Sequence, residues 1–149
     1  LAQIELSPEL LGIPRQYRVG PASYSVDHSS FVGLEKITQG VGRRPYQPVH
    51  LRAVSDASGL TFGWVRRTRT GGDAWGAMDV PVGENAEAYL VRVVSGDVPV
   101  REETVNSPTW TYTGADQAGD GVEAPFDVEV AQVSDLFGPG IFARIAINA

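Results

Sequence analysis

The 149-residue sequence contains no cysteine, one methionine and two histidines. The absence of cysteine excludes a disulfide framework and a thiolate metal site, and it leaves the redox compartment open. Two histidines far apart in sequence, without thiolates, do not favour a zinc site. No apolar run reaches the roughly 18 residues that a transmembrane helix needs, so the sequence predicts no membrane span.

Positive charge is also scarce, since the net charge is −6. This argues against nucleic acid as the main partner, because a phosphate backbone selects basic surfaces. The charge is uneven: residues 1–70 hold nine Lys or Arg against five Asp or Glu, whereas residues 71–149 hold three against thirteen. The asymmetry is consistent with electrostatic docking, of one part on the other or on neighbouring subunits, and equally with an ordinary solvated surface.

The composition is that of a globular protein, with 42% hydrophobic and 20% charged residues. Seventeen glycines and ten prolines favour many turns, and therefore short strands over long helices. Residues 1–11 lack the basic region of a signal peptide, and the first residue is Leu rather than Met. We expect the chain to be a piece of a longer polypeptide.

Alternation of apolar and polar residues predicts seven short strands. They cover residues 49–54, 60–65, 88–93, 98–105, 109–113, 126–133 and 141–147. In the second of these, Leu60, Phe62 and Trp64 share one face, which predicts Trp64 as a core residue. Seven strands between turn signals, without a long helix, predict an all-β fold, an antiparallel β-sandwich.

The N-terminal third of the chain shows no sustained period. Ser7-Pro8 is an N-cap signature, but Gly12 and Pro14 end any helix within a turn or two. We predict an irregular N-terminal arm over residues 1–47, which could not bury enough apolar area to order itself, followed by a sandwich domain over residues 48–149.

Five motifs in the sandwich region carry a family resemblance. They are Leu60-Thr61-Phe62-Gly63-Trp64, Tyr89-x-Val91-x-Val93, Trp110-Thr111-Tyr112, Phe126-x-Val128-x-Val130 and Phe137-Gly138-Pro139-Gly140. In this order they resemble a fibronectin type III domain, which implies an immunoglobulin-like sandwich of about seven strands. The chain departs from the family in a long B–C insertion over residues 67–87. It also has Phe126 where the family often has a corner tyrosine.

A second resemblance spans nearly the whole chain. Its motifs are Pro14-Arg15-x-Tyr17-Arg18-Val19-Gly20-Pro21-Ala22, Gly42-Arg43-Arg44-Pro45, Phe62-Gly63-Trp64-Val65-Arg66-Arg67-Thr68-Arg69, Gly72-Asp73-x-Trp75 and Ser107-Pro108-Thr109-Trp110-Thr111-Tyr112-Thr113. They resemble the C-terminal portion of the large tail-tip baseplate hub ("megatron") protein of gene transfer agents and related siphophages. The resemblance implies a structural protein of the virion tail tip, homotrimeric in its assembly, with other baseplate proteins as partners and a role in host attachment.

Candidate interface residues lie in and beside the insertion. Arg66, Arg67 and Arg69 could pair with carboxylates of another subunit, and a solvated rim is the alternative. Trp75 and Trp110 support an alternative function, a carbohydrate-binding sandwich that stacks on host surface glycans. Trp75 could equally fold back and cap the sandwich.

The sequence predicts no catalytic constellation and no cofactor. Asp27, His28 and Ser29 are sequence neighbours, so they cannot converge as a triad and are better explained by a turn. Adjacent Glu102 and Glu103 point to opposite faces of a strand. One less favoured metal hypothesis remains, a cation held on a Gly-rich loop. Its ligands would be Asp116, Asp120 and Glu123.

Overall fold

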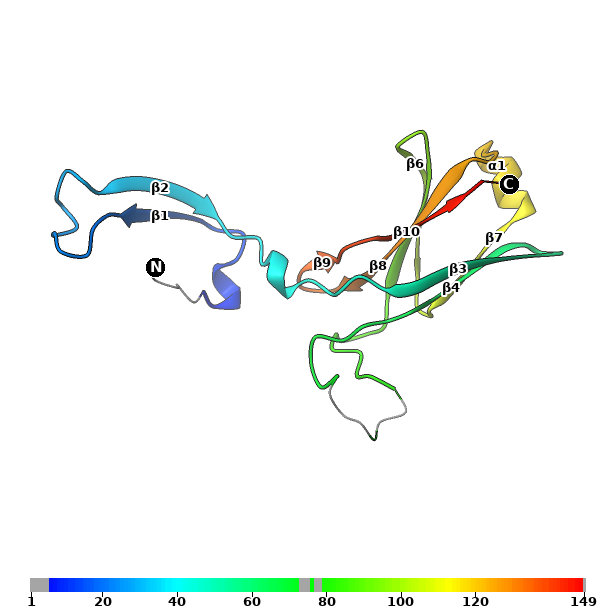
Figure 1. The fold of residues 1–149 in the computed structure, drawn as a ribbon, viewed down its shortest axis with the longest axis horizontal. Helices are drawn as coiled ribbons and strands as arrows, with labels where there is room; N and C mark the ends of the chain where they lie inside the picture. Colours follow the sequence, from blue (N-terminus) through cyan, green and yellow to red (C-terminus); the bar gives the residue numbers. More distant parts are fainter. Residues whose placement is uncertain (1–5, 73–75, 77–78, 149) are drawn as a thin grey trace. The chain divides into compact units, whose positions relative to one another are not determined.

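The structure is a computed structural model that describes residues 6–72, 76 and 79–148 (Figure 1). The chain divides into two compact units, Leu1–Arg43 and Arg44–Ala149, each with its own internal contacts. The division falls slightly before the predicted arm boundary at residue 47. The Trp75 hypothesis lies outside the described residues.

Unit 1 contains a β-hairpin where the sequence predicted an irregular arm. Strands β1 (Pro14–Val19) and β2 (Val32–Ile37) pair antiparallel along their whole length. Two short 3-10 turns, η1 (Pro8–Leu10) and η2 (Val41–Arg43), lie on either side of the hairpin in the sequence. The prediction was wrong because all but two residues of these strands are exposed. A strand with both faces in solvent does not show the alternation of apolar and polar residues by which strands are recognised.

Unit 2 is an antiparallel β-sandwich. One sheet has the order β3 (Val49–Asp56), β4 (Gly59–Val65), β7 (Thr109–Thr113). The other has the order β10 (Ala143–Ile147), β8 (Phe126–Ser134), β5 (Tyr89–Ser95), β6 (Val98–Val105), and the two-residue β9 (Gly138–Pro139) pairs with β8. The seven predicted strands are confirmed to within a few residues. The described residues between β4 and β5 contain neither helix nor strand, as expected for an insertion.

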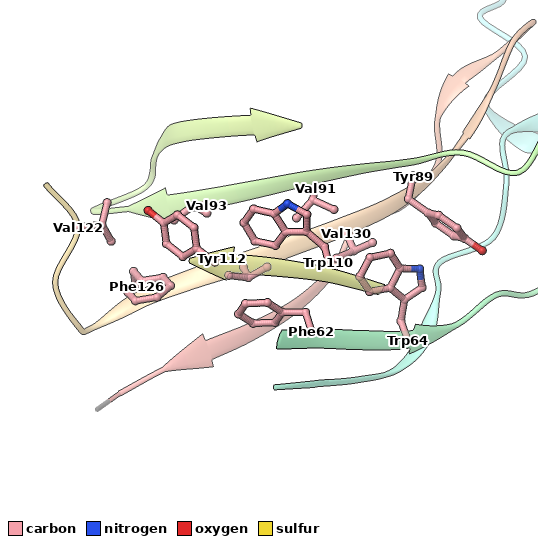
Figure 2. Packing of buried hydrophobic residues seen from close by; sticks show 11 residues of the cluster. Phe62, Trp64, Tyr89, Val91, Val93, Trp110, Tyr112, Val122, Phe126 and Val130 are labelled. Carbon is pink, nitrogen blue, oxygen red and sulfur yellow. The ribbon is translucent and has the colours of Figure 1, made fainter. Parts of the chain in front are cut away.

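Aromatic and valine side chains, all but Val122 from the two sheets, form the core (Figure 2). Its members are Phe62, Trp64, Tyr89, Val91, Val93, Trp110, Tyr112, Val122, Phe126, Val128 and Val130. Trp64 is 5% exposed and packs edge-on against Tyr89, with 5.2 Å between ring centroids. The prediction of Trp64 as a core residue is confirmed. Burying each such side chain stabilises the fold by about 1.5–3 kcal/mol.

The first residues of unit 2 pack against the segment that enters β10. The Gln47 side-chain amide donates to the Phe142 carbonyl oxygen at 2.7 Å. A Cβ at Gly140 would overlap the Pro45 carbonyl oxygen, so the close approach of these two segments requires glycine. We call this contact between residues 45–47 and 140–142 the entry junction.

Candidate interaction surfaces

One face of the hairpin combines apolar and basic side chains. Opposed residues of an antiparallel pair lie on the same face, and the register opposes Tyr17 to Leu34 and Val19 to Val32. The next pair on this face is Arg15 and Lys36. We call these six residues the ribbon face.

The apolar part of the ribbon face is largely open to solvent. Val19 is 56% exposed, Val32 60% and Leu34 40%. Among the described residues of unit 1, only Gly40 is buried. Because an isolated two-stranded hairpin is at best marginally stable in water, a further surface is needed to stabilise the ribbon.

The opposite face of the hairpin is more polar. The Gln16 side-chain amide donates to the Glu35 carboxylate across the strands. Arg18 pairs with Asp27 of the connecting turns at 3.4 Å, and both side chains are at least half exposed. Exposed pairs of this kind contribute little to stability, so they do not replace a hydrophobic core.

Arg66 is bound inside the chain. Its guanidinium donates to the Asp79 carboxylate and to the Val80 carbonyl oxygen, both at 2.7 Å, and to Glu87 at 3.1 Å. Glu87 also accepts a hydrogen bond from the Tyr89 hydroxyl at 2.7 Å. The cluster therefore joins both ends of the insertion to the core strand β5.

Arg69 is bound in the same way, whereas Arg67 forms no ion pair within the part of the chain that the structure describes. Arg69 pairs with Glu84 at 2.8 Å, and the two side chains are mostly buried. Arg67 is exposed, with its guanidinium 5.1 Å from the centroid of the Tyr46 ring. This geometry does not support the expectation that Arg66 and Arg69 reach another subunit, because carboxylates of the same chain occupy both groups. Within the described residues, Arg67 is the member of the triplet that has no carboxylate partner.

Trp110 belongs to the core and is not a stacking platform. The residue is 7% exposed, and its ring stacks with those of Phe62 and Tyr112. Its indole nitrogen donates to Glu103 at 2.9 Å. A buried indole cannot lie on a sugar ring, which removes Trp110 from the carbohydrate hypothesis.

The acidic candidates lie on and after a short helix. Residues Gly114–Asp120 form α1, capped by the Thr113 side chain and ended by Gly121 in the left-handed region. The Gly-rich loop predicted there is therefore wrong. Glu123 lies beyond the helix and is exposed.

Arg101 binds two of these acidic residues. It pairs with Asp120 at 2.6 Å and with Asp116 at 3.0 Å, and Asp120 also accepts from the Tyr112 hydroxyl at 2.8 Å. The hydrogen bond from Arg101 lowers the pKa of Asp120 below its usual value. No three His, Asp or Glu side chains converge as metal ligands in the described part of the chain, so these acids do not form the cation site hypothesised.

The remaining sequence candidates are local contacts. His28 stacks on Tyr24 and bonds to the Ser30 hydroxyl through Nδ1 at 2.9 Å, in exposed turns. Glu102 pairs with Arg92, whereas Glu103 binds Trp110 on the core side. The two glutamates therefore point to opposite faces, as predicted.

A row of alternating charge crosses the outer face of the larger sheet. The strand register sets Arg92 opposite both Glu102 and Glu129, and Glu129 opposite Arg144. Arg92 also lies over the Phe142 ring at 4.3 Å from its centroid. The sequence alone does not reveal this row, because residues on different strands become neighbours only once the strand order is known.

Shallow hollows occur on the sandwich surface. One of about 300 Å³ lies beside the Arg69–Glu84 pair and reaches Ser134, Leu136 and Phe137 at the end of β8. It is open to solvent and partly lined by an ion pair that is already satisfied. Ligand pockets are typically enclosed and mostly apolar, so the geometry does not favour a small-molecule site here.

The strand order of unit 2 defines a fibronectin type III-like β-sandwich, as the sequence predicted. Domains d3–d4 of the rat CD45 extracellular region are similar at 9% identity and TM-score 0.48, covering 99% of this chain and 70% of that chain. The structure "FN3tt mut" is similar at 16% identity and TM-score 0.46, covering 70% and 94%. No protein-family model and no curated protein matches the sequence. None of the helices in the described residues has the length and apolar character needed to cross a bilayer.

Proposed function

We propose that this chain is a structural and adhesive module of a phage-like tail-tip, or baseplate, protein. The fibronectin-like sandwich is the scaffold, and the hairpin packs against neighbouring virion subunits. Contact with the host envelope is a second role of the same exposed surfaces. The proposal involves no catalysis and no cofactor.

One observation carries the proposal: the ribbon face exposes apolar side chains on a hairpin that has no core of its own. Covering half-exposed valine and leucine side chains is favourable by about 1 kcal/mol each, which is half of their full burial energy. An assembly with several copies multiplies such weak contacts. The sequence resemblance to tail-tip proteins supplies the kind of assembly, including its threefold symmetry.

The carbohydrate-binding alternative proposed two tryptophans that stack on sugar rings, and Trp110 cannot be one of them because it is buried. It now depends on Trp75 alone. A glycan array probed with the wild-type chain and with Trp75→Ala tests it directly. Glycan binding that Trp75→Ala abolishes would favour the alternative over an assembly module.

The assembly function is tested in particles that carry this chain. Val19→Asp combined with Val32→Asp places two carboxylates on the ribbon face. Val26→Asp is the matched control, because Val26 is 51% exposed in the turns of the same hairpin and lies outside both strands. We expect electron microscopy to show defective tail tips for the double variant and normal ones for the control. Normal particles from both variants would refute the proposal.

A further inference from the structure

Two like charges are opposed on the ribbon face. The register places Arg15 directly across from Lys36. Like charges in this position destabilise a strand pair. In the described part of the chain, no carboxylate forms an ion pair with either residue. A partner that supplies a carboxylate would remove this repulsion.

The rest of the ribbon face is apolar, so the surface that covers it should be apolar as well. Tyr17 and Leu34 lie next to the basic pair, and Val19 and Val32 lie beyond them. The complementary surface therefore combines exposed apolar groups with a carboxylate. Such a combination fixes both the position and the orientation of the contact, because the charges set the register and the apolar groups exclude water.

The sandwich of this same chain offers that combination. Residues 71–149 carry ten more acidic than basic residues. At the turn after β8, Asp135 is exposed and forms no ion pair within the described residues, and its neighbour Leu136 is 78% exposed. Most other acidic groups described above are already paired with arginine.

We propose that the ribbon face of one copy binds the Asp135–Leu136 turn of a second copy. Each copy then contributes a hairpin to one neighbour and a sandwich to the other, which is a head-to-tail contact. Such contacts close into a ring where the rotation permits. The inference rests on the proposed function, because it names the neighbouring subunit that the hairpin binds.

Charge reversal tests the pairing in the full chain. Sedimentation velocity over a concentration series measures self-association of the wild type, of Arg15→Glu with Lys36→Glu, of Asp135→Lys, and of the combination of all three. We expect each reversal alone to raise the dissociation constant at least tenfold and the combination to restore it. Added salt should weaken the wild-type contact, because the charged groups lie at the surface. Val26→Asp should leave association unchanged.

Three results would overturn the inference. One is a wild-type chain that is monomeric at all concentrations. The second is association that neither charge reversal weakens, which would assign it to another surface. The third is protection of the ribbon amides from hydrogen exchange that does not depend on concentration, which would assign the ribbon face to a surface of the same chain.

The two proposals fail separately. A monomeric chain whose ribbon variants still give defective particles would leave the assembly function intact and make the partner a different protein. A self-associating chain whose ribbon variants give normal particles would leave the head-to-tail contact intact and refute the assembly function.

Discussion

Replacing Arg66 by glutamine should free the insertion while the sandwich stays folded. The two stronger contacts of Arg66 are those to the Val80 carbonyl oxygen and to Glu87, since the Arg66 side chain is 16% exposed and that of Glu87 24%. The Asp79 side chain is 68% exposed, so that ion pair is worth about 0–1 kcal/mol at most. Hydrogen bonds to charged groups contribute about 1.5–3 kcal/mol each, and bonds from one group do not add fully. We therefore expect a local loss of about 2–4 kcal/mol.

Limited proteolysis measures this local loss. A loss of this size makes opening of the insertion about 30- to 1,000-fold more frequent, because each 1.4 kcal/mol is a factor of ten. Cleavage within residues 79–85 should accelerate accordingly, whereas the urea unfolding midpoint of the sandwich should change little, because local opening and global unfolding are separate events.

Arg67→Gln is the matched control for Arg66→Gln. It removes the same charge one residue further on, from an exposed side chain without a hydrogen bond in the described residues. Equal cleavage rates in the two variants would refute the anchoring role of Arg66. So would a fall in global stability as large as the local loss.

Three further predictions concern the sandwich. Gly140→Ala should lower the free energy of unfolding by about 1–3 kcal/mol, measured in urea, because the added methyl overlaps the Pro45 carbonyl oxygen. Val128→Ala should cost about 2–3 kcal/mol in the same assay, since Val128 is fully buried and the change leaves a cavity. The pKa of Asp120 is lowered by Arg101, so its contribution to stability is present above about pH 4 and is lost as the pH falls through the folded-state pKa. As the pH is lowered below about 4, the melting temperature should therefore fall less in Asp120→Asn than in the wild type, measured by thermal unfolding.

The sandwich strands could be predicted because one face of each strand is exposed to solvent and the other is buried in the core. Phe126, Val128 and Val130 alternate with polar residues for this reason, and all three are buried. Hairpin strands such as β1 face water on both sides, so their sequence does not alternate between apolar and polar residues. Helix α1 was missed because glycines at 114 and 119 lower helix propensity, although the Thr113 cap and the Gly121 stop were readable signals.

The candidate surfaces were harder to predict than the fold. The insertion carboxylates that bind Arg66 and Arg69 lie 13 to 21 residues away in sequence, and no local pattern selects them from the other acids. The burial of Trp110 could be predicted from the sequence, because Trp110 and Tyr112 share one face of a strand and threonines alternate with them. Its partner Glu103 on β6 could not be inferred without the strand order.

The entry junction has a mechanical consequence. The chain passes from Arg44 into the sandwich through the contact of residues 45–47 with residues 140–142. A pulling force applied to the hairpin would act on this contact first, and the force could separate β3 from β4 only after the contact had broken. Removing the Gln47 side-chain amide, or adding a methyl group at Gly140, should therefore lower the rupture force measured by optical tweezers. The contact between Pro45 and Gly140 would then protect β3 from being peeled off the sheet when the chain is loaded from its N-terminal side.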